Sequence, residues 1–595
     1  MKFRNILLTT FAASAFVIGT TSCSDSFLDE KMYSSYGPEV SDVNAKLVGL
    51  HRQYAAIWGM SSQQGFVGCW QVGTDVGAPG DTQGVEVPFY RYQELNAENA
   101  GVSFLWEKLY ELINSANQII ASQAEGGDAA AIAEAMFFRA YAYNMLVTLW
   151  GDVPLVTEST SIPRTDYTRN AVAEVDGVID SDLVYAMSNL PVVGAAKNES
   201  RINQDMARQL AGEAYLRMGM RDASYFKKAE DAVTPIITGG KYELISARYG
   251  KYAAEPGDYY HDMFRWGNQR RSQGNMEAIW TFEMEYNRDV NGGTIDNPQQ
   301  RRNWVPAFHK LDGMVNADSI GGRGNGRLRI SNFVKYGLYE KGDIRNSNYN
   351  IRRVMWYNKP GFSKEVGIDA KGFLVDKDKG VRNVTLKTGD QVIPHEGDSL
   401  NVFYPHPTKW GAYDETDDFG YAVVKDWPVM RLGETYLLRA EARFRQGNTQ
   451  GAADDINVLR DRAFKDYRAV APGAGKVTAD QIDIDFILDE RARELISEEN
   501  RRMTLVRTNT LAERIKLNGD MEPAAPSNKV ITGFDANIHT LLPIPLTEIQ
   551  LNKDGYRVGS GEVAGFQTGF GEPGDQSLLS ADAVARLIRS FAEKL

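Results

Sequence analysis

The fold is decided by residues 431–442, which read Arg431-Leu432-Gly433-Glu434-Thr435-Tyr436-Leu437-Leu438-Arg439-Ala440-Glu441-Ala442. Apolar residues recur there at helical spacing, at Tyr436, Leu437 and Ala440, and the pattern continues to Phe444. The stretch therefore predicts an amphipathic helix with one apolar face. Because charged side chains clustered on such helices usually satisfy one another, we interpret the Arg and Glu residues as structural ion pairs rather than catalytic groups. The same interpretation applies to Glu490, Arg491, Arg493 and Glu494.

A second helix follows at the spacing of a helical hairpin. The hairpin pattern consists of apolar and small residues at Tyr436, Ala440, Gly447, Ala452 and Ile456. This is the spacing of a tetratricopeptide pair, in which small residues let two helices cross closely. A similar pattern occupies residues 212–219, and helical periodicity also marks residues 106–120 and 207–218. Because these segments lie far apart in sequence, they predict an all-α scaffold of tetratricopeptide-like pairs, not a simple solenoid.

Between the helical segments the character of the chain changes. From Tyr242 to Trp427, Gly, Asn, Asp and aromatic residues dominate, and short runs such as residues 278–282 predict isolated strands. We therefore expect an N-terminal helical region at 23–240, a loop-rich and aromatic-rich insert at 241–430, a C-terminal helical region at 431–556 and a tail of unknown role at 557–595. Loops on a rigid frame commonly carry binding sites, so we expect the function to reside in the insert.

The first residues predict export and anchoring. Lys2 and Arg4 precede an apolar run of about 13 residues, too short for the roughly 20 that span a bilayer, so residues 1–22 are expected to form a signal peptide. Cys23 follows a stretch of small residues and is predicted to be lipidated, the alternative being an unmodified cysteine. Cys69 is the only other cysteine, which leaves no partner for a disulfide once Cys23 is acylated.

Composition restricts the possible partners. The 595-residue chain carries a formal net charge of −12, which argues against nucleic acid because nucleic acids select basic surfaces. No segment after the leader has 18 uninterrupted apolar residues, so the chain is predicted to be anchored and not to span the membrane.

An ordered series of motifs extends from Cys23 to about Tyr556. Its members are Cys23 to Asp29, Trp106 to Asn117, Arg139-Ala140 with Gly151-Asp152-Val153-Pro154, Arg201-Ile202-Asn203, Asn275 to Trp280, Arg431 to Ala442, Asn457 to Arg462, Glu490-Arg491 with Glu494-Leu495, and Leu542-Pro543-Ile544-Pro545. In this series the chain resembles the RagB/SusD family. The sequence departs from the family at Asn552-Lys553, where Asn-Pro is common.

The resemblance implies both a location and a partner. Such proteins are lipid-anchored at the outer membrane and face the cell exterior. They form a lid on a SusC-like TonB-dependent barrel, to which they deliver oligosaccharides or, in some cases, peptides. Asp25, Asp29 and Glu30 resemble the surface-export signal of these lipoproteins, although they would also suit a polar tether. The resemblance implies a binding protein, not an enzyme.

Sugars are bound by exposed aromatic rings combined with polar groups that bond hydroxyls. This combination selects as candidate glycan-binding residues Trp70, Asp75, Tyr259, Tyr260, Trp266, Asn268, Tyr286 and Trp304. Each aromatic residue taken alone is more often a packing residue, because Trp is highly buried on average. Trp106, Trp150, Trp280 and Trp427 lie inside scaffold motifs and are predicted to be core.

Other chemistries find weaker support. A glycoside hydrolase needs two carboxylates at a defined separation, which sequence cannot supply. Residues 376–380 resemble part of a calcium loop but lack the closing Glu, so no metal and no cofactor is predicted. Two further hypotheses remain on the same scaffold: a peptide- or protein-binding member with a more charged pocket, and an adaptor that only holds the barrel partner.

Overall fold

The structure is a computed structural model that describes residues 42–58, 67–80, 85–160, 162, 164–196, 198–284, 300–400, 402–415, 417–419, 425–518, 531–552, 557–558 and 562–563. The predicted signal peptide, Cys23 and Tyr286 lie outside the described residues. The chain divides into two units, Met1–Gly49 and Leu50–Leu595. The described part of the first unit is the beginning of one helix, and the second unit contains every later element.

Helices provide most of the regular structure. They are α2 (Val43–Ile57), α3 (Ala100–Gln123), α4 (Ala129–Trp150), α5 (Val172–Asn189), α6 (Gln204–Gly219), α7 (Ser224–Thr238), α8 (Tyr259–Asp262), α9 (Gln300–Trp304), α10 (Leu432–Arg445), α11 (Thr449–Ala463), α12 (Ile484–Leu495), α13 (Arg501–Arg507), α14 (Leu511–Arg514), α15 (Ala536–His539) and α16 (Leu546–Leu551). The predicted helices at 106–120, 207–218 and 436–444 are confirmed as α3, α6 and α10.

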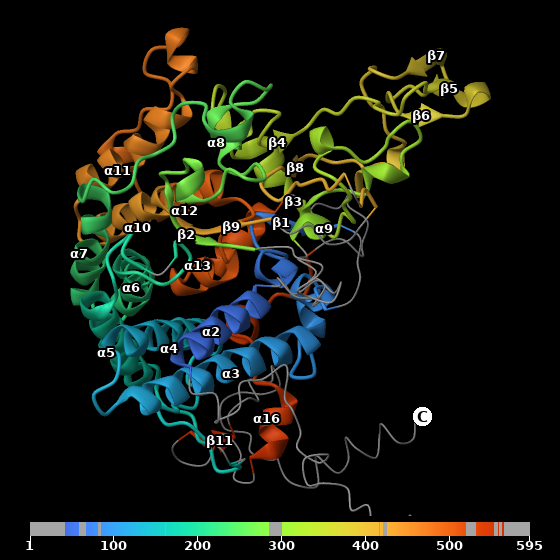
Figure 1. Cartoon of the computed structure of the whole chain (residues 1–595). Coiled ribbons are helices and arrows are strands. Elements are labelled where there is room, and N and C mark those ends of the chain that lie inside the picture. Colours follow the sequence, from blue (N-terminus) through green and yellow to red (C-terminus); the bar gives the residue numbers. More distant parts are fainter. Residues whose placement is uncertain are drawn as a thin grey trace, which may run out of the picture. The chain divides into compact units, whose positions relative to one another are not determined.

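The long helices pack in an order that joins both halves of the sequence. Along the series from α3 to α7, each helix contacts the next, and α7 then contacts α10, which also contacts α11 and α12 (Figure 1). Although about 190 residues separate α7 from α10 in the sequence, these two helices are neighbours. The chain between them therefore leaves the scaffold and returns to it at adjacent places, as a loop-rich insert must.

Small residues allow the close helix crossings that the sequence predicts. A Cβ atom on Gly212 of α6 would lie 2.4 Å from Cγ1 of Val233 on α7. A Cβ atom on Gly219 would lie 2.3 Å from the ring of Phe226. Both distances are shorter than carbon atoms tolerate, so only glycine permits α6 and α7 to approach this closely.

Helix α4 lies at the centre of the helical layer. It contacts α3, α5, α6 and α13, and nearly all its side chains from Ala131 to Trp150 are buried. A helix that is apolar around most of its circumference is expected to be covered on all sides. It ends at Gly151, whose φ of +73° reverses the backbone before Pro154.

The strands are short and pair across long stretches of sequence. They are β1 (Gly77–Pro79), β2 (Ala278–Phe282), β3 (Leu328–Ile330), β4 (Ile351–Arg352), β5 (Ser363–Ile368), β6 (Leu374–Val375), β7 (Arg382–Lys387), β8 (His406–Pro407), β9 (Trp427–Arg431), β10 (Arg557–Val558) and β11 (Glu562–Val563). The antiparallel pairs are β1–β3, β2–β9, β4–β8 and β10–β11, and β5 pairs with both β6 and β7. The predicted strand at 278–282 is confirmed as β2.

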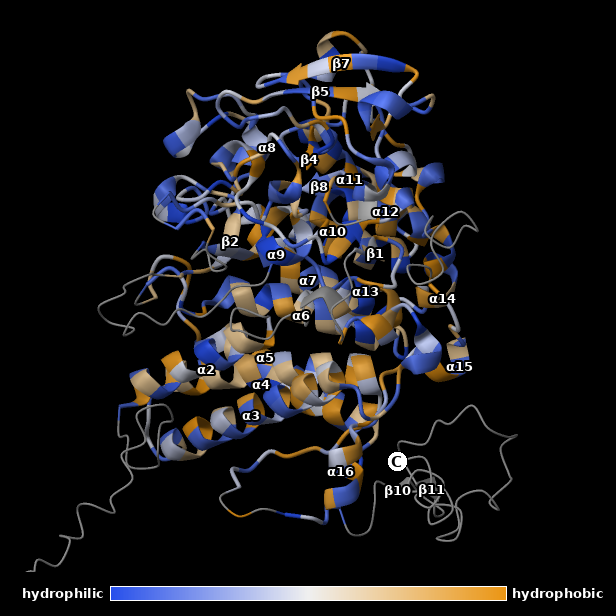
Figure 2. Ribbon diagram, turned by 90° about the vertical axis from the view of Figure 1, so that its right-hand side faces the viewer, coloured by the Kyte–Doolittle hydropathy of each residue, from blue (hydrophilic) through white to orange (hydrophobic). Residues whose placement is uncertain are grey.

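The three-stranded sheet belongs to a small second core inside the insert. Val366 of β5 and Leu386 of β7 are buried in one cluster with Phe308, Met355 and Tyr357. Figure 2 shows β5 and β7 at the opposite end of the second unit from α3 and α4. The insert is therefore partly self-supporting, so its loops rest on packed side chains as well as on the helices.

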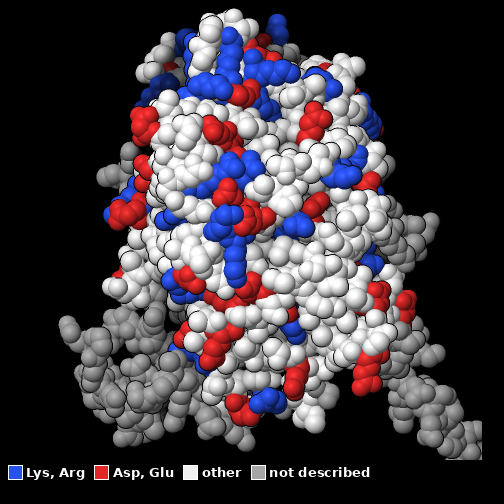
Figure 3. Space-filling model, turned by 90° about the vertical axis from the view of Figure 1, so that its left-hand side faces the viewer, with Lys and Arg blue, Asp and Glu red and all other residues white. Residues whose placement is uncertain are grey.

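The face formed by the helical pairs carries mixed charge. Lys228 on α7 pairs with Asp180 on α5 at 2.9 Å, and Arg443 on α10 pairs with Glu230 on α7 at 2.9 Å. Figure 3 shows basic and acidic residues interspersed on this face, with more basic ones at the top and more acidic ones at the bottom. Among the described residues, no helix is both long and apolar enough to cross a membrane.

Candidate functional site

A cavity of about 420 Å³ opens in the loops of the insert. It lies within the range of about 300–1,000 Å³ that ligand pockets occupy. Four segments line it, at residues 252–266, 318–321, 349–352 and 406–412. Figures 1 and 2 show α8, β4 and β8, which contribute to three of these segments, lying side by side. We refer to this cavity as the insert pocket.

Aromatic rings form much of the wall of the insert pocket. Trp266 and Tyr349 retain 39% and 38% of their surface exposed, so both can contact a ligand. Tyr252 also lines the cavity, and the guanidinium of Arg265 lies 3.6 Å above its ring. The His261 ring is stacked on Tyr349, with ring centroids 6.0 Å apart. The pocket thus presents flat apolar faces with polar edges.

Polar groups surround these rings. Arg265 is bonded to Glu255 at 2.7 Å and approaches Asp318 at 3.5 Å, and more than half of the surface of each of these carboxylates is exposed. Arg352 on β4 and His406 on β8, which pair across the two strands, both line the cavity. Burial, followed by the nearby Arg352, lowers the pKa of His406 to about 3, so its imidazole is neutral at physiological pH.

Asp258 holds two walls of the insert pocket together. Its carboxylate caps α8 by accepting a bond from the backbone N–H of His261. The same carboxylate accepts bonds from the Ser347 hydroxyl at 2.6 Å and from the Asn350 amide at 3.0 Å. Since Tyr349 lies between these two residues, the N-cap of α8 also fixes the loop that carries Tyr349.

Arg248 and Asn268 fix the segment that carries Tyr252. The guanidinium of Arg248 donates to Asp262 at 2.6 Å and to the backbone carbonyl of Tyr252 at 2.7 Å. The Asn268 side chain accepts a bond from the backbone N–H of Lys251 at 3.0 Å. A bond that joins a side chain to a loop backbone restricts the loop, so these residues position the pocket without lining it.

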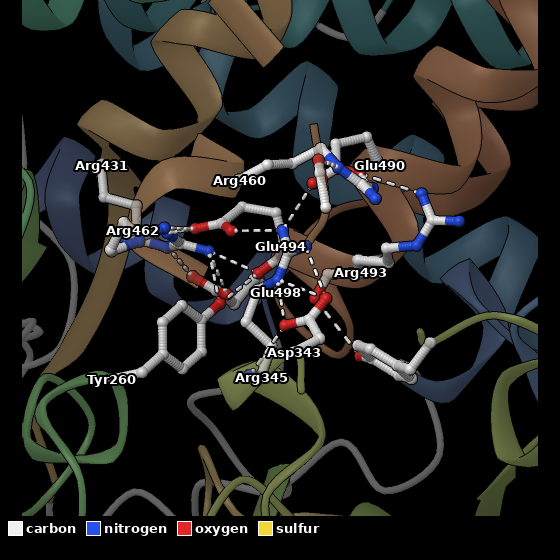
Figure 4. Close-up of polar contacts among 12 residues, drawn as sticks. Tyr260, Asp343, Arg345, Arg431, Arg460, Arg462, Glu490, Arg493, Glu494 and Glu498 are labelled. Atoms are coloured by element: carbon white, nitrogen blue, oxygen red, sulfur yellow. Dashed lines mark hydrogen bonds and ion pairs between the residues drawn. The ribbon is translucent and has the colours of Figure 1, made fainter. Parts of the chain in front are cut away.

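Behind the pocket lies a buried cluster of charged residues (Figure 4). Glu494 of α12 is bonded to Arg431 at 2.5 Å, to Arg345 at 2.9 Å and also to Arg462. The Tyr260 hydroxyl donates to the backbone carbonyl of Glu494, which joins α8 to this cluster. The predicted structural ion pairing is therefore confirmed, with partners drawn mostly from other elements.

The cluster explains why residue 433 is glycine and why Glu494 stays ionised. A Cβ atom on Gly433 would lie 2.6 Å from Nη1 of Arg431 and 2.8 Å from Oε1 of Glu494, so glycine leaves room for this ion pair. Burial by itself raises the pKa of Glu494, but Arg462, Arg431 and Arg345 outweigh it and hold the pKa well below its usual value. A carboxylate held ionised among arginines stabilises structure and is unsuited to proton transfer.

The predicted ligand-binding residues differ in whether they are buried or reach the pocket. Of the seven that are described, Trp266 lines the insert pocket. The other six are buried: Trp70, Asp75, Tyr259, Tyr260, Asn268 and Trp304. The expectation that these six are exposed in loops is wrong, because the loops pack against the helices and against each other.

The partners of the buried residues give them structural roles. Trp70 meets the Trp58 ring edge-on at a centroid distance of 4.2 Å. Asp75 is bonded to Arg501 at 2.6 Å and to Arg514 at 2.9 Å. The Tyr259 hydroxyl donates to the carbonyl of Arg462, and Trp304 has no exposed surface. In this conformation none of these side chains can contact a glycan.

Sequence reasoning missed Tyr252, His261, Tyr349 and Arg352, which line the pocket. Tyr349 could have been found, since it lies between two asparagines and so has the aromatic-and-amide pattern used to select other candidates. The remaining three carry no such local signal, because the pocket is assembled from four segments that are far apart in the sequence.

A second cavity, of about 70 Å³, lies among α4, α6, α10 and α13. It is well below the size of a ligand pocket and suits only small groups such as water molecules. Among the described residues, no group of three or more His, Cys, Asp or Glu side chains could hold a metal ion. The insert pocket is therefore a stronger candidate site than this second cavity.

The fold is thus a scaffold of helical pairs that carries an aromatic pocket in its loops, and known proteins share the fold. The family model described as "SusD family" matches residues 276–557, and the one described as "Starch-binding associating with outer membrane" matches residues 26–218. The chain is 25% identical to SusD-like protein P25 of Formosa agariphila, over 93% of this chain and 97% of that protein. The chain belongs to the SusD family.

Two further comparisons agree. Starch-binding protein SusD of Bacteroides thetaiotaomicron is 35% identical over 129 residues, which cover 22% of this chain and 20% of that protein. Surface glycan-binding protein A from the same species, solved in complex with laminarihexaose, aligns with a TM-score of 0.60 and 17% identity over 86% of this chain and 97% of that one. The predicted SusD-like all-α fold is confirmed.

Proposed function

We propose that the protein captures oligosaccharides in the insert pocket and does not cleave them. The observation that carries the proposal is the convergence of Trp266, Tyr349 and Tyr252 with charged groups around one cavity of suitable volume. Aromatic faces stack on the apolar C–H faces of a sugar ring, and the polar groups beside them bond its hydroxyls. Membership of a family that includes starch-binding proteins supports the same function.

The roles of the pocket residues follow from their chemistry. Trp266 and Tyr349 present partly exposed faces and would stack on sugar rings. Arg265 and the rim carboxylates Glu255 and Asp318 can donate to and accept from hydroxyl groups. The alternative ligand on this scaffold is a peptide, but the aromatic lining of the insert pocket favours a sugar.

Titration calorimetry of residues 24–595 against plant, host and microbial oligosaccharides and a set of peptides tests this proposal. Saturable binding to one glycan class should weaken at least tenfold in Trp266→Ala and in Tyr349→Ala, because stacking at each ring is lost. Tyr336→Ala serves as the matched control, since Tyr336 is 79% exposed and lies outside the pocket lining. Equal affinity in all three variants would refute the site, and cleavage of the recovered ligand would refute binding without catalysis.

The proposal extends to the location and partner of the protein. In it, acylated Cys23 anchors the chain to the outer membrane with the pocket facing the cell exterior, and a SusC-like TonB-dependent barrel receives the glycan. The description of one matching family model, which refers to outer-membrane association, supports this location. Cys23→Ala should release the protein from membrane fractions, and a tagged wild-type chain should co-purify with the barrel. Unchanged fractionation of the variant would contradict anchoring at Cys23.

A further inference from the structure

The charge state of the insert pocket points to a narrower class of ligand. Arg352 lines the cavity with 9% of its surface exposed. Within the described part of the chain, its guanidinium has no carboxylate partner, and its Nη1 is buried without a hydrogen-bond acceptor. In contrast, Arg345, which is even more deeply buried, is bonded to Asp343, Glu490 and Glu494.

A buried charge without a partner is costly, because it gives up hydration and gains no ion pair. That cost is visible in the pKa of Arg352, which burial lowers to about 10. Asp318 is close enough to act on the charge of Arg352, but it lies at the rim, where it is shared with Arg265. The protein therefore retains a guanidinium that a ligand anion would satisfy.

Other groups around the pocket add to its positive potential. Lys425 is buried, and its side-chain nitrogen donates to the backbone carbonyls of Lys409 and Gly411, the second of which lines the cavity. Burial lowers the pKa of Lys425 to about 7, so this group carries a partial positive charge near neutral pH. The pKa of His261 lies well below its usual value because of burial, then Arg352, Arg265 and Lys425. Because His261 is neutral and Lys425 is only partly charged, the positive charge of the interior comes mainly from Arg352. The two carboxylates lie at the rim, where solvent screens them.

We infer that the insert pocket selects glycans that carry an anionic group, a carboxylate or a sulfate ester, and that Arg352 binds this group while Trp266 and Tyr349 hold the ring. The inference rests on the proposed glycan-binding function of the same pocket. A guanidinium binds carboxylate and sulfate oxygens through paired N–H donors, which gives strength and orientation together. The bound anion would supply a partner that the described residues do not give Arg352.

Matched ligands separate this inference from glycan binding in general. The carboxylate pair is tri-galacturonic acid and its carboxyl-reduced form, and the sulfate pair is a κ-carrageenan tetrasaccharide and its desulfated form. In calorimetry, the charged member of at least one pair should bind at least tenfold more tightly than its neutral counterpart. The pair that shows this difference identifies the anion. Because Arg352 is buried and salt screens buried charges much less than exposed ones, most of the difference should remain between 50 and 500 mM NaCl.

Arg352→Gln supplies the decisive variant. It should lower affinity for the charged glycan by about tenfold to a hundredfold, the range for loss of a charge-assisted hydrogen bond, and leave affinity for the neutral analogue unchanged. Arg352→Lys should restore part of the affinity, because the charge remains and the paired donors are lost. Without ligand, Arg352→Gln should unfold at the same temperature as the wild type or higher, which shows that the variant folds.

Each contrary result has a distinct meaning. Equal binding of charged and neutral glycans, unaffected by Arg352→Gln, would overturn the inference and leave glycan capture intact. Binding of hexaglutamate but of no saccharide would overturn both, in favour of an acidic peptide ligand. Failure of every saccharide, charged or neutral, to bind would also overturn both.

Discussion

Replacement of Glu494 by Gln tests how the scaffold supports the pocket. Glu494 is fully buried, and three arginines, Arg345, Arg431 and Arg462, bond to its carboxylate. Gln is nearly isosteric but neutral, so these arginines would lose a shared counter-charge in a site that excludes water. Breaking a buried ion pair from one side typically costs about 3–5 kcal/mol. We therefore expect a loss of unfolding free energy in that range.

Urea denaturation of residues 24–595, followed by circular dichroism, measures this loss. For an m-value of about 3 kcal/mol/M, the midpoint should fall by about 1–1.7 M. Glu396→Gln is the control, since Glu396 forms an ion pair with Lys371 in which both side chains are about two-thirds exposed. The control midpoint should stay within error of the wild type. If Glu494→Gln changes the midpoint no more than the control does, the buried cluster does not stabilise the scaffold.

Three further predictions concern the same scaffold. Asp75→Asn should cost about 3–5 kcal/mol of unfolding free energy, because it leaves Arg501 buried with one carboxylate fewer. A denaturation midpoint equal to that of the wild type would contradict a structural role for Asp75. Trp70→Ala should cost a similar amount through the cavity it creates, yet calorimetry of the folded variant should show unchanged glycan affinity; weaker binding would return Trp70 to the site. Burial raises the pKa values of Glu490 and Glu499, but neighbouring arginines outweigh burial and lower both pKa values from 4.5 to about 2. Each carboxylate should therefore contribute about 3 kcal/mol to the unfolding free energy. This contribution is present above pH 4.5 and is lost as the pH falls towards 2. Denaturation midpoints measured from pH 6 to pH 2.5 should fall steeply below pH 4.5, and a flat profile would contradict this assignment.

The scaffold could be predicted because its signals are local. Helical periodicity can be recognised within a single segment of sequence. It predicted α6, α10 and the hairpin that α10 forms with α11. Trp106, Trp150, Trp280 and Trp427, predicted as core from their motifs, are all buried. The strand β2 was also recognisable, but its partner β9 begins about 145 residues after it ends, and no local pattern encodes such a pairing.

The site could be predicted only in part because exposure is not a local property. Trp304 follows an asparagine, Asn303, which is the sequence pattern of a sugar-binding loop, but both residues are fully buried. Trp266 lies in a similar sequence pattern and remains partly exposed beside the pocket. The difference arises from which loops pack over each residue, and this depends on the whole insert. Arg352 was missed for a related reason, since its lack of a carboxylate partner among the described residues is visible only once its neighbours in the fold are known.

The most direct test of the account is a crystal structure of residues 24–595 bound to the tightest oligosaccharide found by calorimetry. We predict a sugar ring stacked on Trp266 or Tyr349, with its hydroxyl groups bonded to Arg265, Glu255 or Asp318. An oligosaccharide bound on another face, with the insert pocket empty, would contradict the central claim.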